Sequence, residues 1–499
     1  MNEHEKSDDC VVPMKRPNNG SVTAGSAEGV EERRPVKGNS LKETKDRTQS
    51  REALQHARQR LREAAVRYCD EPLNSLWHHC YNVDHLRATF FSMKKNAAAG
   101  VDGVTWEAYA ENLEGNLADL SDRLARGAYR ARPVRRTFIP KADGRLRPLG
   151  IPALEDKLVQ SLTKSVLEEI YERIFLGFSY GSRPGKKAHD ALDALTVGIE
   201  RGRVNWVLDA DIRGYFDAID HDCLIEMIEH RIGDKRVLRH IKKWLNAGVL
   251  EDGRKTIAEF GTPQGGSISP LLANIYLHYI LDVWVKEWRR MHARGSVTIV
   301  RYVDDFVLGF QHEDDARRFL AELKERLAEF HLELHPEKTR LIEFGRFATE
   351  RRGRFGLGRP ETFDFLGFTH FCAKTREGRF QVGRKTEKKR MIAKLKVIKV
   401  KLRKRMHLPI QVVGAWLRRV VEGHFRYFAV PGNQRSLKCF RERLTRLWYT
   451  VIRRRSHKAR LPWARMLTIL DRHLPRPTIL HPWPSQRFYA NTRGRSPVR

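Results

Sequence analysis

Three aspartates that close apolar runs are the residues of this chain best suited to carry out chemistry. Asp304 and Asp305 separate the runs 297–300 and 306–310, whose β-branched and aromatic residues predict a hairpin with both carboxylates at its tip. Two acidic residues at a turn are most often only solvated. Asp211, however, closes another apolar run 93 residues upstream of Asp304. Together the three carboxylates would suit two Mg²⁺ ions about 3.5–4 Å apart, the arrangement that promotes phosphoryl transfer, and they predict a polymerase.

The charge of the chain favours a polyanionic partner. Its 499 residues carry a formal net charge of +33, and the sequence pI is about 10.2. Residues 371–460 hold 28 Lys and Arg against 4 Asp and Glu, a net charge of +24. Basic runs are commonly no more than solvated surface, but this density favours binding to nucleic acid.

The cysteines and the hydropathy of the chain exclude several classes. The six cysteines contain no C-x-x-C pair, so neither a zinc site nor a disulfide framework is expected. We find no apolar signal core and no run long enough to span a membrane. The sequence therefore predicts an intracellular, soluble protein that works without zinc and without a membrane.

Local patterns predict the elements that must position the carboxylates. Alternation and bracketing prolines indicate a hairpin over 132–149, and apolar spacing indicates helices over 154–175 and 221–250. A further strand is predicted over 363–368. Residues 1–50 contain nine basic and nine acidic residues and no aromatic residue, a composition typical of a disordered leader.

Basic amphipathic helices are predicted from residue 386 onward. Met391, Leu395, Ile398 and Leu402 recur at helical spacing with lysines and arginines between them, which indicates a small bundle with basic outer faces. The basic residues that we expect to bind RNA are Lys388, Lys389, Arg390, Lys394, Arg403, Lys404, Arg405, Arg453, Arg454 and Arg455.

Four blocks of sequence carry a resemblance to a known family. Residues 211–216, 261–270, 302–305 and 338–339 follow the order and spacing of reverse transcriptase motifs. With the basic helical C-terminal region, the chain resembles a group II intron-encoded reverse transcriptase and maturase over roughly residues 60–485. Many relatives continue into an endonuclease with paired cysteines and histidines, which this sequence does not contain.

The resemblance implies a right-hand polymerase of the α+β class, with an antiparallel palm sheet. It divides the chain into the leader 1–50, an N-terminal extension and fingers over 51–205, the palm over 206–380, a helical thumb or maturase domain over 381–482 and a short basic tail over 483–499.

The resemblance also assigns roles to single residues. Asp211, Asp304 and Asp305 would hold the two Mg²⁺ ions, and Lys338 would protonate the departing pyrophosphate. Phe216 matches the steric gate that selects deoxynucleotides, although a plain core phenylalanine is the alternative. The remaining nucleotide-binding residues are the triphosphate clamp Lys141 and Arg147 and the loop residues Gln264 and Gly265, where a glycine lets two backbones approach.

The expected function is RNA-directed DNA synthesis combined with binding of an intron RNA, in support of splicing and retrohoming. The partners would be the group II intron RNA, an RNA template, a DNA primer or target and deoxynucleoside triphosphates, in a bacterial cytoplasmic ribonucleoprotein. A retron-like or defence-associated reverse transcriptase is one alternative. An RNA-binding splicing cofactor without polymerase activity is the other.

Overall fold

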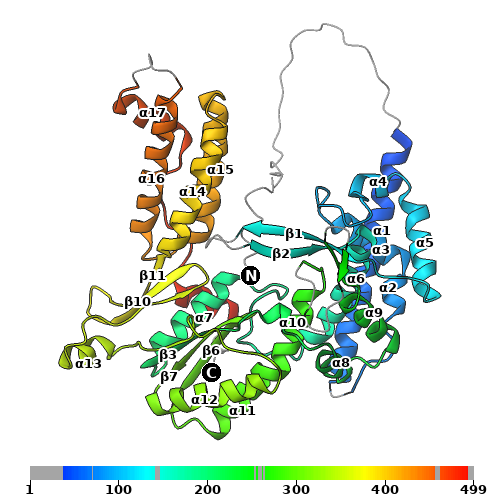
Figure 1. Cartoon of the computed structure of the whole chain (residues 1–499), viewed down its shortest axis with the longest axis horizontal. Helices are drawn as coiled ribbons and strands as arrows, with labels where there is room; N and C mark the ends of the chain where they lie inside the picture. The colour runs from blue at the N-terminus through cyan, green and yellow to red at the C-terminus, as the bar shows by residue number, and fades with distance from the viewer. Residues whose placement is uncertain are drawn as a thin grey trace.

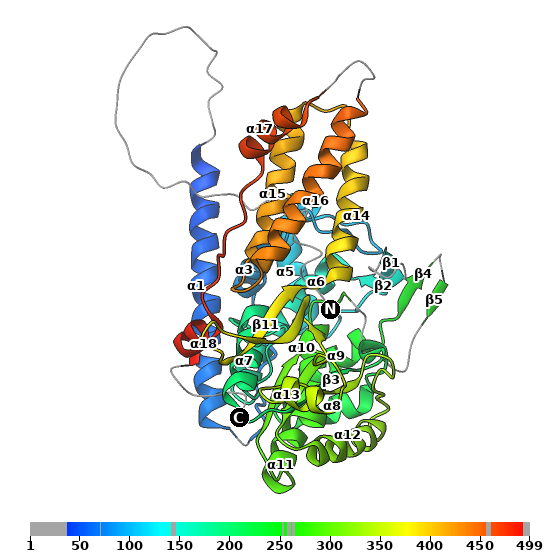
Figure 2. The same ribbon diagram turned by 90° about the vertical axis from the view of Figure 1, so that its left-hand side faces the viewer.

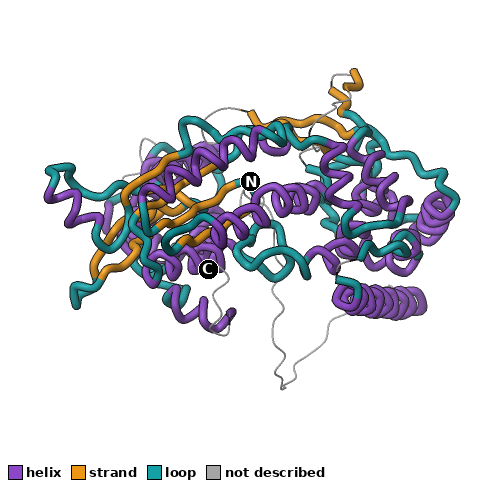
Figure 3. Tube along the Cα trace, turned by 90° about the horizontal axis from the view of Figure 1, so that it is seen from below, coloured by secondary structure: helices purple, strands orange, loops and turns teal. Residues whose placement is uncertain are grey.

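The computed structural model describes residues 37–69, 71–140, 146–251, 254–256, 261, 265–455 and 461–492. The described chain combines helices with three sheets, which confirms the α+β class (Figure 1). The N-terminal helices gather at one end of the molecule, and the other end holds the central and C-terminal sheets (Figures 1 and 3).

The N-terminal helices begin earlier than the composition predicts. Helix α1 (Lys37–Arg67) includes residues 37–50, which were expected to belong to the disordered leader; residues 1–36 lie outside the described residues. The early start has a tertiary cause. The Ser50 hydroxyl donates to Asp84 at 3.0 Å, and the Arg47 guanidinium lies 4.7 Å from the centre of the Phe91 ring. Both partners belong to helix α3 (Val83–Ser92).

The remaining helices of this end pack around α1 and α3. They are α2 (His78–Tyr81), α4 (Trp106–Ala110), α5 (Leu113–Ala125) and α6 (Leu154–Tyr171). Buried Glu169 of α6 accepts from Arg58 at 2.7 Å and from Arg62 at 2.9 Å, which fixes α1 along α6.

The predicted N-terminal hairpin is confirmed. Strand β1 (Val134–Pro140) pairs antiparallel with β2 (Leu146–Ile151), and β1 also pairs in parallel with β4 (Val249–Glu251). With β5 (Arg254–Thr256) the order of this sheet is β2-β1-β4-β5.

The central sheet carries the three aspartates. Its order is β6-β7-β3-β8, formed by β6 (Val297–Tyr302), β7 (Asp305–Phe310), β3 (Trp206–Asp211) and β8 (Arg340–Glu343). All neighbours are antiparallel. Helix α7 (Ala188–Arg201) packs against β6 and β7, and α12 (Glu313–Ala328) packs against β3 and β7.

The segment after β3 contains two helices where the sequence predicts one. Helices α8 (His221–Glu229) and α9 (Lys235–Leu245) are separated by a turn, so the predicted helix over 221–250 is wrong. The Asp234 carboxylate caps α9 through the amide of Arg236 and also accepts from the amides of Leu76 and Trp77. These distant contacts stabilise a break that apolar spacing does not reveal.

Helix α10 (Ser269–Leu277) continues through a π-helical turn (His278–Asp282) into α11 (Val283–Met291). After the central sheet, α13 (Ala348–Arg354) precedes a third sheet of order β11-β10-β9. Strands β9 (Phe363–Phe365) and β10 (Phe368–Lys374) form a tight hairpin, so the single strand predicted over 363–368 is also wrong. Leu366 has φ +48° and Gly367 has φ +78°, which turns the chain there.

Four C-terminal helices stand together above the third sheet, which ends with β11 (Phe380–Thr386). They are α14 (Lys388–Lys404), α15 (Ile410–Phe428), α16 (Gln434–Arg453) and α17 (Trp463–His473), and α18 (Pro484–Thr492) lies apart from them. Met391, Leu395, Ile398 and Leu402 are buried as predicted. From α17 the chain returns to the level of α7, against which α18 packs (Figure 2).

Candidate active site

Strand register brings the three aspartates together. Asp211, the last residue of β3, lies directly across the ladder from Asp305, the first residue of β7. Tyr302 pairs with Asp305 in the β6–β7 hairpin, so Val303 and Asp304 form a two-residue turn beside the same end of the sheet. The structure therefore brings Asp211, Asp304 and Asp305 together at one end of the central sheet, as the sequence predicts.

A lysine from a separate segment reaches the same end of the central sheet. The chain before β8 runs alongside the end of β3, where the amide of His335 donates to the carbonyl of Asp211 at 2.8 Å. Leu334 forms an isolated antiparallel bridge with Ile212. This path lets the Lys338 ammonium group donate to the Asp211 carboxylate. Lys338 is thus in contact with one of the predicted metal ligands.

Burial and mutual repulsion shape the charge of the site. Burial raises the pKa of Asp305 well above its usual value, and the neighbouring carboxylates Asp209, Asp211 and Asp304 add to the effect. Burial also raises the pKa of Asp304, with a further contribution from Asp211. The Oδ1 atom of Asp304 is buried and has no hydrogen-bond partner among the described residues. Burial and repulsion both disfavour the charged carboxylates, and a bound cation would favour them.

Sequence reasoning missed a fourth carboxylate, Asp209. Residues two apart on a strand face the same side, so the alternation within β3 was the signal that could have identified it. Its carboxylate lies 3.6 Å from the Arg340 guanidinium. Burial raises the pKa of Asp209 to about 7, against the opposing effect of Arg340.

The residues at this end of the sheet fit a divalent cation whose coordination shell is completed by other ligands. Among the described residues no group of three or more His, Cys, Asp or Glu side chains forms a self-sufficient metal site. Mg²⁺ commonly takes only a few protein carboxylates and completes its shell with water and substrate phosphates. The unpartnered Oδ1 of Asp304 and the clustered carboxylates are features that such an ion would satisfy.

The predicted nucleotide-binding residues have different outcomes. Phe216 is buried, with 6% of its surface exposed, in the 3₁₀ turn Tyr215–Asp217 that follows β3. The Tyr215 hydroxyl donates to the carbonyl of Ala273 in α10 at 2.5 Å and ties this turn to that helix. Lys141 and Gln264 lie outside the described residues, whereas Arg147 is half-buried on β2.

Gly265 lies where only glycine fits. Its φ is +115°, and a Cβ at this position would lie 2.4 Å from the carbonyl oxygen of Gly150 on β2. The predicted close approach of two backbones is therefore present, and it joins the loop before α10 to the N-terminal hairpin.

The basic helices present part of the predicted RNA-binding set to solvent. Arg405 and Arg455 make intramolecular contacts instead: the Arg405 guanidinium lies 4.7 Å from the centre of the Trp416 ring, and Arg455 donates to the carbonyl of Leu408 at 2.7 Å. Arg390 and Lys394 are half-buried. The exposed residues are Lys388, Lys389, Arg403, Lys404, Arg453 and Arg454.

Three clustered aspartates at the end of an antiparallel sheet, with a lysine bound to one of them, form an arrangement that suits nucleotidyl transfer. Residues 139–370 match the reverse transcriptase (RNA-dependent DNA polymerase) family. The matched segment includes all three aspartates and Lys338.

Three similar proteins, two of them bacterial and one from a yeast, share sequence with part of this chain. Over 249 residues the chain is 38% identical to protein YkfC of Escherichia coli, a match that covers 44% of this chain and 64% of YkfC. Over 228 residues it is 37% identical to the group II intron-encoded protein LtrA of Lactococcus lactis, covering 46% of this chain and 38% of LtrA. It is also 37% identical over 203 residues to an uncharacterized 91 kDa protein in the cob intron of Schizosaccharomyces pombe, covering 40% and 24% of the two chains.

The predicted relationship to group II intron-encoded reverse transcriptases is thereby confirmed. The matches span less than two thirds of the length of each of these relatives. In the described part of the chain, none of the helices is both long and apolar enough to cross a membrane.

Proposed function

We propose that this protein is an RNA-directed DNA polymerase that also binds a group II intron RNA. The observation that carries the proposal is the register of the central sheet, which sets Asp211 across from Asp305 with Asp304 in the adjoining turn. The match of residues 139–370 to the reverse transcriptase family supports the same reaction.

Each residue of the site would have its own role in nucleotidyl transfer. Asp211, Asp304 and Asp305 would hold two Mg²⁺ ions, which when bound lower the pKa of the primer 3′-hydroxyl and neutralise the triphosphate. Lys338 would give a proton to the departing pyrophosphate, a role that the contact of its ammonium group with Asp211 supports. Phe216 would form the floor on which the deoxyribose rests and would exclude a 2′-hydroxyl.

The arrangement of elements supports a right-hand polymerase. The central sheet with the aspartates would be the palm within 206–380, and the β1–β2 hairpin, with Lys141 and Arg147, would belong to the fingers within 51–205. The bundle of α14, α15 and α16 would be the thumb within 381–482.

The intron RNA is the partner that the basic helices favour. The exposed basic residues of α14 include Lys388, Lys389, Arg403 and Lys404. The L. lactis relative is named a group II intron-encoded protein, which supports a group II intron RNA as the partner. Binding through many phosphates should weaken by about 0.7–0.9 log units per log of salt for each contact.

Primer extension is the test of the polymerase. Wild-type protein should extend a DNA primer on an RNA template with deoxynucleotides and Mg²⁺, and Asp305→Ala should not. Asp314→Ala is the matched control, since this carboxylate is 79% exposed on α12. Absence of extension by wild-type protein that still binds structured RNA would refute the polymerase and favour a splicing cofactor.

A second experiment separates the two activities. We expect the double variant Asp304→Ala, Asp305→Ala to lose DNA synthesis and to keep RNA affinity and splicing assistance, because the basic helices lie outside the central sheet. Loss of RNA affinity in that variant would contradict this assignment. Preference for a different structured RNA over a group II intron would favour the retron-like alternative.

A further inference from the structure

The turn that carries Asp304 has a conformation that its sequence does not favour. Val303 is the first residue of the two-residue turn between β6 and β7, and its φ is +60°. This region suits glycine, asparagine or aspartate, whereas a β-branched side chain there costs about 1–3 kcal/mol. Val303 is also buried, with 2% of its surface exposed. Contacts from elsewhere must therefore hold the turn.

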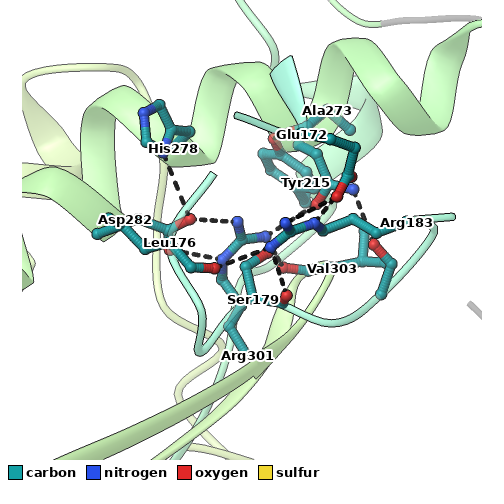
Figure 4. A network of polar contacts seen from close by, with 12 residues as sticks. Glu172, Leu176, Ser179, Arg183, Tyr215, Ala273, His278, Asp282, Arg301 and Val303 are labelled. Carbon is teal, nitrogen blue, oxygen red and sulfur yellow. Dashed lines mark hydrogen bonds and ion pairs between the residues drawn. The ribbon is translucent and has the colours of Figure 1, made fainter. Parts of the chain in front are cut away.

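One buried arginine reaches this turn directly. Arg301 is fully buried in β6, and its Nη1 donates to the carbonyl of Val303 at 2.9 Å and to Oδ1 of Asn274 at 3.0 Å. Its Nε donates to Oδ1 of Asp282 at 2.7 Å, and its Nη2 donates to the other oxygen of the same carboxylate (Figure 4). The guanidinium thus joins the turn to the π-helical segment that ends at Asp282.

A second set of contacts closes the other side of the turn. The backbone of Arg301 pairs with the segment 178–180, since its amide donates to Phe178 and its carbonyl accepts from Tyr180, each at 2.9 Å. A Cβ at Gly181 would lie 2.5 Å from the Val303 side chain, so the segment that contains Gly181 packs directly against the turn. Asn274 donates to the carbonyl of Gly181 at 2.8 Å and couples this segment to Arg301.

The energetics favour a role in positioning. A fully buried ion pair contributes little net stability compared with apolar residues of similar volume, because both charges lose their water. Arg301 and Asp282 are both completely buried in the described structure. A bidentate arginine can, however, fix one geometry through its planar fork, which lysine cannot do.

We propose that Arg301 is a positioning residue that holds the strained Val303 turn and so sets the carboxylate of Asp304 for nucleotidyl transfer. This inference rests on the proposed polymerase function. It assigns to Asp282 and Asn274 the task of orienting the guanidinium, and to Gly181 the task of confining the turn.

The first test compares two buried arginines of the same region. Arg301→Lys keeps a charge for Asp282 but cannot also serve the Val303 carbonyl and Asn274. Arg183→Lys is the matched control, because Arg183 is buried and bonds Glu172 and the carbonyls of Leu176 and Ser179. We expect kcat for single-nucleotide addition to fall about 10- to 100-fold in Arg301→Lys, with a smaller change in the KM for the nucleotide. In Arg183→Lys kcat should fall less than about threefold.

The second test asks whether relaxing the turn rescues the variant. Glycine accepts a positive φ without strain, so Val303→Gly should reduce the need for Arg301. In a double-mutant cycle, the fold loss in kcat from Arg301→Lys should be at least about fivefold smaller in the Val303→Gly background than with Val303. A purely structural ion pair would give the same fold loss in both backgrounds.

Asn274→Ala supplies a third variant if Arg301→Lys does not fold, because it leaves the ion pair intact. It should lower kcat in the same direction, and Val303→Gly should again reduce that loss. Equal losses in both backgrounds, or wild-type kcat in Arg301→Lys, would overturn the inference. Failure of wild-type protein to extend primers would instead refute the proposed function, so the two failures are distinguishable.

Discussion

Replacing Asp193 by asparagine should release the C-terminal helix α18 from the body of the protein. The Asp193 carboxylate is 1% exposed in α7 and accepts from two arginines that lie far apart in the sequence. Arg384 of β11 donates to it at 3.1 Å, and Arg487 of α18 donates from Nε to its other oxygen. One carboxylate therefore connects α7, the third sheet and α18.

The size of the effect follows from the burial of the two arginines. Arg384 is 2% exposed and Arg487 is 17% exposed. Burial lowers the pKa of the Arg384 guanidinium, and Asp193 is the largest influence that opposes this shift. Removing one member of a buried ion pair costs about 3–5 kcal/mol. Because each 1.4 kcal/mol is about tenfold, opening of α18 should become about 10²- to 4 × 10³-fold more frequent.

Hydrogen exchange of the intact protein measures this opening. The amides at the end of α18 should lose protection by that factor in Asp193→Asn, while the strands of the central sheet keep theirs. Asp471→Asn is the control, because its carboxylate is 53% exposed where it pairs with Arg441. Unchanged protection of α18 in a folded Asp193→Asn protein, or an equal loss in the control, would refute the reasoning.

Three further predictions concern single residues. Lys338→Met should lower the single-turnover rate of nucleotide addition about 10²-fold and leave primer–template affinity unchanged, and equal rates would contradict a proton-donating role. Gly265→Ala should abolish primer extension because its Cβ would clash with the Gly150 backbone. Gly378 also has a positive φ, but a Cβ there meets no atom of the described residues within 4 Å, so Gly378→Ala should retain primer extension. Burial lowers the pKa of His424 to about 3 in the folded protein, whereas in the unfolded chain it is about 6.5. As the pH falls below about 6.5, only the unfolded chain binds the proton, so the free energy of unfolding should fall by about 1.4 kcal/mol per pH unit. Urea unfolding at pH 7.5 and 5.5 should show a shallower pH dependence in His424→Leu than in wild-type protein.

Local pattern was sufficient for the parts of the site that lie within one element. The alternation around Asp304 and Asp305 predicts the hairpin, and the apolar run before Asp211 predicts β3; both are confirmed. The spacing of Met391 and its partners predicts the buried face of α14, because helical periodicity is also local.

Local pattern failed where a distant contact decides the structure. The break between α8 and α9 depends on Asp234 binding the amides of Leu76 and Trp77, more than 150 residues away in the sequence. The early start of α1 depends in the same way on contacts with α3. Neither partner is visible in the spacing of the segment itself.

The sequence by itself determined the residue types of the site, the elements that carry them and the basic C-terminal helices, because charge, alternation and periodicity are properties of neighbouring residues. Only the tertiary structure decided that Asp211 lies across from Asp305, that Lys338 reaches Asp211 and that Arg301 supports the turn of Asp304. The physical reason is register: sliding a strand by one residue sends every side chain to the opposite face, and only the packed sheet selects one register.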